Sequence, residues 1–69
     1  MARHRWFIQD KLSQKFVITF GIEWEELIDD IDHASYWTTK KGATYVMGVM
    51  SELFPKFHNI KVDLQVIRR

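Results

Sequence analysis

The sequence contains no cysteine, which excludes disulfide bonds and any thiolate acting as a nucleophile or metal ligand. Its three histidines, His4, His33 and His58, lie far apart and form no pair at the spacing of metal ligands. Its three glycines are isolated, so the sequence has no glycine-rich phosphate-binding loop. We therefore expect no cofactor and no enzymatic activity.

Long apolar runs are also missing. A membrane-spanning helix needs about 18–20 apolar residues, and no stretch of the chain approaches that length. The basic residues 1–6 lead into no apolar segment of the roughly 7–15 residues that a signal peptide requires. These absences predict a cytoplasmic protein.

The chain is short but rich in apolar residues. Its 69 residues suffice for a single domain, residues 1–69, which buries only about 60% of the surface that its unfolded chain exposes. Hydrophobic residues make up 46% of the sequence and include three Trp and five Phe. We expect an aromatic-rich core with a thin margin of stability, and a homodimer is one way of widening that margin.

Alternating apolar residues predict an antiparallel hairpin near the N-terminus. Residues 4–9 and residues 15–20 each read as a strand, and a polar segment of about five residues joins them. Successive side chains of a strand point to opposite faces. We expect Trp6, Phe16 and Ile18 to face the helix that follows later in the chain.

The clearest predicted element is an amphipathic helix. Thr39 is a good N-cap, and Pro55 cannot continue the hydrogen-bond ladder, so we expect the helix to end around Pro55. Its apolar face comprises Ala43, Val46, Met47, Met50, Leu53 and Phe54. Residues 60–67 then alternate cleanly as a last strand. This order predicts an α+β fold, in which one helix covers one face of a three- or four-stranded, mainly antiparallel sheet.

Six of the nine carboxylates fall within ten residues between the hairpin and the helix. They are Glu23, Glu25, Glu26, Asp29, Asp30 and Asp32. Leu27, Ile28 and Ile31 recur within this stretch at helical spacing, so it forms either one short helical turn or a loop anchored by these side chains. Such a concentration of one charge can steer a basic partner. The alternative is a solvated segment that keeps a small protein soluble.

A metal site in this acidic stretch has little support. An EF-hand loop starting at Glu23 would need a glycine at its sixth position, and none is there. What is left is an improvised Mg²⁺ or Ca²⁺ site formed by Asp29, Asp30 and Asp32. We expect no metal.

Apolar residues on the outward sheet face form a second candidate contact. If the helix covers Trp6 and Phe16, then Phe7, Val17 and Ile67 face outward. Together with an exposed Trp24, they would provide a patch for a protein partner or a second copy of the chain. The alternative is that they are scattered, singly exposed residues, which are common on protein surfaces.

Basic residues near the two ends form a third candidate. The set consists of Arg3, Arg5, Lys61, Arg68 and Arg69. If the first and last strands pair, the arginines gather at one or both ends of the sheet and could contact single-stranded RNA or DNA. A net charge of only +1 and the lack of an RRM aromatic signature argue against this function. The alternative is a set of solvated terminal side chains.

Residues 32–43 resemble a pattern in small phage and prophage proteins, in which a hairpin precedes an alanine, an aromatic residue, a threonine cap and an alanine inside the helix. The matching positions here are Ala34, Trp37, Thr39 and Ala43. The resemblance implies a short strand near 35–37 and an accessory protein of a mobile element, and such proteins commonly bind and inhibit a host protein. The chain departs from the pattern at Gly42, where an acidic residue would complete a capping box.

These patterns favour a non-enzymatic regulator or inhibitor that binds a protein partner in the cytoplasm, which is the host cytoplasm if a phage encodes it. The acidic stretch would steer the partner, and exposed aromatic side chains would anchor it. The alternative function is a small nucleic-acid-binding module.

Overall fold

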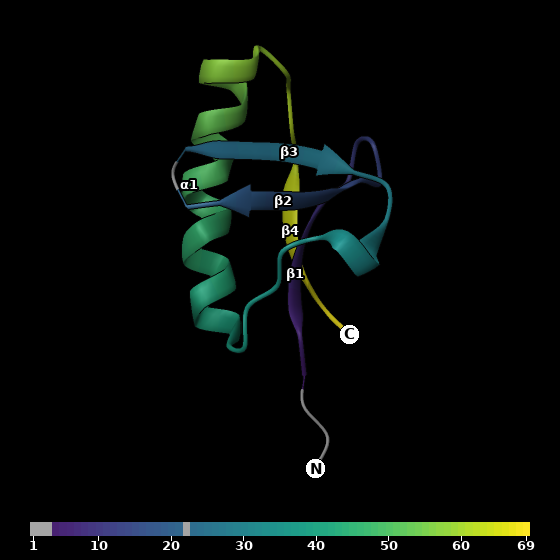
Figure 1. Ribbon diagram of the computed structural model, residues 1–69. Coiled ribbons are helices and arrows are strands. Elements are labelled where there is room, and N and C mark those ends of the chain that lie inside the picture. The colour runs from purple at the N-terminus through teal and green to yellow at the C-terminus, as the bar shows by residue number, and fades with distance from the viewer. Residues whose placement is uncertain (1–3, 22) are drawn as a thin grey trace.

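The computed structural model describes residues 4–21 and 23–69 (Figure 1). Its elements are β1 (Trp6–Asp10), β2 (Phe16–Phe20), β3 (Trp24–Ile28), the 3-10 turn η1 (Ile31–His33), α1 (Lys40–His58) and β4 (Leu64–Arg68). The four strands form one antiparallel sheet in the order β3-β2-β1-β4. The predicted α+β fold is confirmed, including the pairing of the last strand with a strand of the first hairpin.

The sheet consists of two ribbons that cross. β1 pairs with β4 along its whole length, and β2 pairs likewise with β3, but β1 and β2 share only the register pair Gln9↔Phe16. Figure 1 accordingly shows β2 and β3 running across the direction of β1 and β4. The backbones of Trp6 and Trp37 exchange two hydrogen bonds of 2.9 Å on the side of β1 away from β4. A single bridge thus forms where a short strand was expected.

The helix begins where the sequence predicts. The hydroxyl oxygen of Thr39 accepts the backbone N–H of the third helical residue at 3.1 Å. The expected end at Pro55 is wrong, because α1 continues to His58. Pro55 lies in the last turn, where its missing N–H forfeits only one hydrogen bond. Asn59 then closes the helix in the left-handed conformation (φ 53°), and its N–H donates to the carbonyl of Phe54.

The core lies between α1 and one face of the sheet. Ile8, Val17, Met50 and Phe54 form a buried cluster. The apolar helix face is confirmed, since all six of its predicted members are buried or partly buried. The predicted sheet face is wrong for β2, because Val17 is fully buried in this cluster. The pairing of Phe16 with Gln9 places Phe16 on the face opposite Ile8, and therefore away from α1.

The second sheet face is also partly covered. Phe7 is only 6% exposed, and its ring lies 6.0 Å from the ring of Tyr36 in the segment that connects η1 to α1. Ile67, its cross-strand neighbour, is half-buried. The expectation that Phe7, Val17 and Ile67 form an exposed patch is therefore wrong. The segment that follows β3 covers part of the face that was predicted to be open.

Candidate functional site

The outer strand β3 is the element of greatest functional interest. It pairs with β2 on one side, and the sheet of described residues has no strand on its other side. A hollow of about 710 Å³ opens along this outer edge. Four consecutive β3 residues, Trp24 to Leu27, line the hollow, whereas no residue of β2 does. The backbone edge of β3 is therefore accessible from a ready-made groove.

Three other segments complete the hollow. The β1–β2 turn contributes Asp10, Leu12, Ser13 and Lys15, the end of α1 contributes Phe54 and His58, and the connection to β4 contributes Ile60 and Lys61. Leu12 is 58% exposed and Ile60 is 41% exposed. The groove thus offers apolar side chains together with charges of both signs, a composition that suits a peptide better than a single small ion.

A stacked aromatic pair stands beside this edge. The rings of Phe20 and Trp24 lie 5.0 Å apart with an interplanar angle of 23°, and the side chains are 62% and 41% exposed. Thr19 fixes the hairpin end, because its hydroxyl donates to the carbonyls of Gly21 (2.9 Å) and Trp24 (3.0 Å). Two large rings held in place by the hairpin can be desolvated by a partner at little cost in side-chain entropy.

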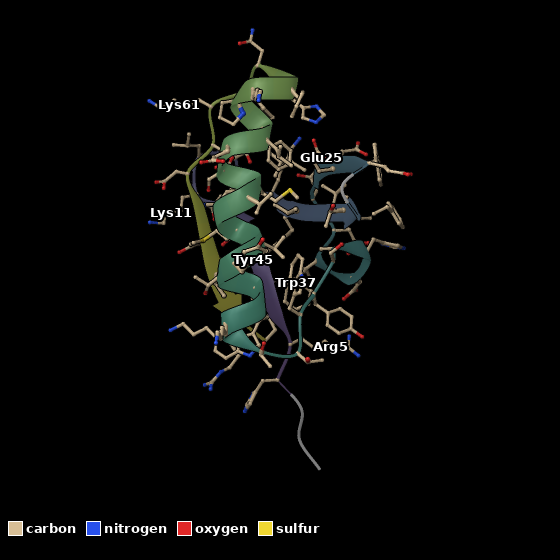
Figure 2. The ribbon with its side chains drawn as sticks, turned by 90° about the vertical axis from the view of Figure 1, so that its left-hand side faces the viewer. Arg5, Lys11, Glu25, Trp37, Tyr45 and Lys61 are labelled. Atoms are coloured by element: carbon tan, nitrogen blue, oxygen red, sulfur yellow. The ribbon has the colours of Figure 1, made fainter. Side chains whose placement is uncertain are left out.

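The predicted acidic site is divided by the fold. Glu25 is only 7% exposed, and its Oε1 accepts a hydrogen bond from Nε2 of His58 at 2.9 Å. This contact ties β3 to the last turn of α1, and Figure 2 shows Glu25 level with that part of the helix. Glu26 points to the opposite face of β3, the face of Trp24, and is exposed. Glu25 is therefore mainly a structural residue of the groove wall, whereas Glu26 is available to a partner.

Glu23 precedes β3, and the other acids, Asp29, Asp30 and Asp32, lie around η1. The expected helical turn is wrong for Leu27 and Ile28, which belong to β3, and only Ile31 lies in the short 3-10 turn. Asp30 caps that turn, with Asp32 N–H donating to its Oδ1 at 2.9 Å and the His33 ring contacting its Oδ2. The backbone N–H of Asp32, and then His33, lower the pKa of Asp30 below its ordinary value. Glu23, Asp29 and Asp32 are exposed. The free acidic surface thus consists of Glu23, Glu26, Asp29 and Asp32.

The predicted basic site is also divided. Arg5 and Arg69 are neighbours, since the backbone N–H of Arg5 donates to the carbonyl of Arg69 at 3.0 Å. Lys61, in contrast, lines the hollow at the far end of the molecule, and Figure 2 shows it well away from Arg5. Arg3 lies outside the described residues. The expectation that Lys61 joins the arginines in one surface is therefore wrong.

Several properties of the groove could not be found in the sequence. Leu12, Lys15 and His58 line it, and no local pattern distinguishes them from other turn and helix residues. The Glu25–His58 contact joins residues 33 positions apart. Of the sequence patterns, only the concentration of acidic residues around Trp24 indicated that this part of the chain is functional.

Other kinds of site find no support in the part of the chain that the structure describes. Residues 4–21 and 23–69 contain no group of three His, Asp or Glu side chains placed to hold a metal ion. None of the described helices combines the length and the apolar character needed to cross a bilayer. Comparisons of the chain with protein-family models, with curated proteins and with solved structures find no match.

Proposed function

We propose that this protein is a non-enzymatic, protein-binding regulator that takes up an extended segment of its partner along the outer edge of β3. The observation that carries the proposal is the opening of this unpaired edge into the hollow. An outer strand presents a row of backbone donors and acceptors, and an added strand satisfies them. Alternate side chains of that added strand would then enter the groove.

The exposed acids at the β3 edge favour a basic segment there, while Lys15 and Lys61 line other parts of the groove. Glu23 and Glu26 are exposed at this edge, and neither carboxylate forms an ion pair within the described residues. Lysine or arginine side chains of a partner would approach both acids and the faces of the Phe20 and Trp24 rings. A second β3 would instead bring acid against acid, so this edge favours a different chain over a homodimer.

The proposal extends to the biological role. The likeness of residues 32–43 to small phage proteins supports an accessory protein that inhibits or redirects a host protein by occupying a strand-pairing segment of it. A groove that relies on backbone pairing is suited to this role, because it needs only a short extended stretch of the target.

Selection from a displayed library of random peptides tests the proposal without knowledge of the natural partner. We expect the selected peptides to alternate apolar residues with Lys or Arg. Trp24→Ala should weaken their binding at least tenfold, whereas Tyr45→Ala, which removes a ring 75% exposed on α1, should leave it unchanged. Enrichment of no peptide, or equal losses with the two variants, would overturn the proposed binding edge.

The electrostatic part of the proposal has its own test. Glu23→Lys combined with Glu26→Lys should slow association with a selected peptide and flatten its dependence on salt. Glu52→Lys, at an exposed position on α1, controls for a change of charge elsewhere. If the association kinetics of the double variant are unchanged, the acids do not steer the partner, and the proposal of strand addition is not affected.

A further inference from the structure

Five cations gather at the end of the molecule opposite the groove. They are Arg5 before β1, Lys40 and Lys41 at the start of α1, and Arg68 and Arg69 at the end of β4. Figure 1 shows that the start of α1 and the C-terminal end of the chain lie at the same end of the fold. We call this set the basic end. Two of its members, Lys40 and Lys41, were not part of the predicted basic site.

Backbone pairing makes the arginines neighbours. Arg5 and Arg69 exchange backbone hydrogen bonds of 3.0 and 2.9 Å, and Arg68 is the register partner of Trp6. The Arg68 guanidinium lies 5.9 Å from the centre of the Trp6 ring, and the Arg5 guanidinium lies 4.6 Å from that of Tyr36. These ring contacts hold the guanidinium groups in place and leave their N–H groups open to a further acceptor.

The two tryptophans extend the surface to the helix. Trp37 is bridged to Trp6, and its Cδ1 lies 3.9 Å from the position that a Cβ on Gly42 would occupy. Gly42 is the third residue of α1, directly after Lys40 and Lys41. Arg68 therefore lies with Trp6 on the sheet face that α1 covers, near the first turn of the helix, whereas Arg5 and Arg69 lie on the opposite face beside Tyr36. The basic end thus wraps around this end of the sheet.

No carboxylate neutralises this region through an ion pair. Within residues 4–21 and 23–69 the two ion pairs both involve histidines, His33 with Asp30 and His58 with Glu25. Among the described residues, Asp32 is the only acid that lines the hollow shared by Arg5 and Arg69. The first turn of α1 holds two lysines and no acid, although the helix dipole favours acids there. The chain thus keeps Lys40 and Lys41 at a helix end where positive charge costs stability.

We propose that the basic end binds the phosphate backbone of a nucleic acid. The five cations come from three separate segments and spread over an open surface, an arrangement that matches a polymer of phosphates better than one enclosed phosphate group. The contacts are to phosphate, so binding does not depend on base sequence. This proposal is independent of the β3 groove.

The salt dependence of binding tests the proposal. Fluorescence anisotropy would follow labelled single-stranded and duplex DNA of about 20 nucleotides between about 50 and 200 mM salt. Each phosphate contact contributes about −0.9 to the slope of log K against log salt for duplex DNA, and about −0.7 for single strands. If each of the five cations contacts one phosphate, the slope should be near −4.5 for duplex and near −3.5 for single strands. Whichever DNA, single-stranded or duplex, binds more tightly is the form of nucleic acid that the basic end prefers.

Two double variants that each remove two positive charges, one inside and one outside the basic end, show where the nucleic acid binds. Arg5→Gln with Arg68→Gln should weaken binding and reduce the magnitude of the duplex slope by about 1.8. Lys11→Gln with Lys56→Gln removes the same charge outside the basic end and should leave the slope unchanged. Circular dichroism would establish that both variants fold. Equal losses in the two variants, or no binding at the lowest salt, would overturn the proposal.

A third variant separates binding from folding. Lys40→Glu places an acid in the first turn of α1, so it should raise the melting temperature while weakening DNA binding. A variant that is both more stable and a poorer binder excludes unfolding as the cause of the loss. Vesicles containing anionic lipid complete the experiment: retention on vesicles without binding to either DNA would assign the basic end to a membrane surface and contradict the proposal.

Discussion

Asp10 is buried between the first turn and the last strand, and its carboxylate accepts four hydrogen bonds. The donors are the backbone N–H of Leu12, the N–H and hydroxyl of Ser13, and the N–H of Asp63, the last at 2.8 Å. Burial by itself raises the pKa of this carboxyl, but the hydrogen bonds outweigh burial and hold the pKa below its ordinary value. One residue therefore closes the β1–β2 turn and fastens the start of β4.

Asp10→Asn should lower the free energy of unfolding by about 1–3 kcal/mol, because the amide turns a donor toward groups that are themselves donors. Urea denaturation at pH 7 measures this change. Ser13→Ala, which removes only the hydroxyl, should cost about 0.5–1.5 kcal/mol and serves as the comparison. Equal stability of Asp10→Asn and the wild type would show that the carboxylate does not fasten the turn.

The same residue predicts a dependence of stability on pH. Its pKa in the folded protein lies below the ordinary value of 3.8, so its contribution is complete above pH 3.8 and is lost as the pH falls through the folded value. The difference in stability between the wild type and Asp10→Asn should therefore shrink as urea titrations are carried from pH 7 to below pH 3.8. A difference that stays constant over this range would contradict the assigned pKa.

Gly21 and Gly48 differ in whether the backbone conformation at their position requires glycine. Gly21 has φ 60°, whereas Gly48 lies in α1 with open space around the position of a Cβ. Gly48→Ala should stabilise the protein by about 0.5–1 kcal/mol through helix propensity. Gly21→Ala should destabilise it by about 1 kcal/mol, because a side chain disfavours the left-handed conformation. Thermal unfolding measures both, and a loss of stability in Gly48→Ala would reveal a close contact at that helix face.

At the scale of elements, the Glu25–His58 hydrogen bond connects β3 to the end of α1. The Glu25 side chain is 8% exposed, so losing its partner leaves a buried carboxylate poorly satisfied. His58→Ala should therefore cost about 1–3 kcal/mol in urea denaturation and reduce peptide binding in the groove. His33→Ala removes the other histidine contact, which is on the surface, and should change stability little. Similar losses in the two variants would contradict the buried role of Glu25.

The elements were largely predictable because their signals are local. The Thr39 cap, the apolar face of α1 and the alternation of the strands depend on neighbours within a few residues. The face that β2 turns to α1 was not predictable, because it depends on which residue pairs with Gln9 across the turn. Alternation alone assigns two faces to a strand and leaves open which of them is buried.

At the scale of the whole molecule, the crossing of the two ribbons creates the groove. β3 lies outside the β1–β4 ribbon, so its edge meets the end of α1 and the β1–β2 turn rather than another strand. The same topology places the basic end at the other end of α1, and Figure 2 shows Arg5 near the start of the helix and Glu25 near its end. Because the two surfaces are far apart, each can be altered without changing the other. The gathering of the arginines followed from the expected pairing of the first and last strands. The groove, and the lysines of the basic end, could not be derived from the sequence, because they combine segments that only the tertiary fold brings together.

The most direct test of the β3 site is amide hydrogen exchange of the protein with and without a selected peptide. Strand addition should slow exchange along Trp24–Ile28, where new backbone hydrogen bonds form, and should leave Leu64–Arg68 at the opposite edge of the sheet unchanged. Protection that is confined to β4 or to α1, with no change in β3, would contradict binding at the outer edge of β3.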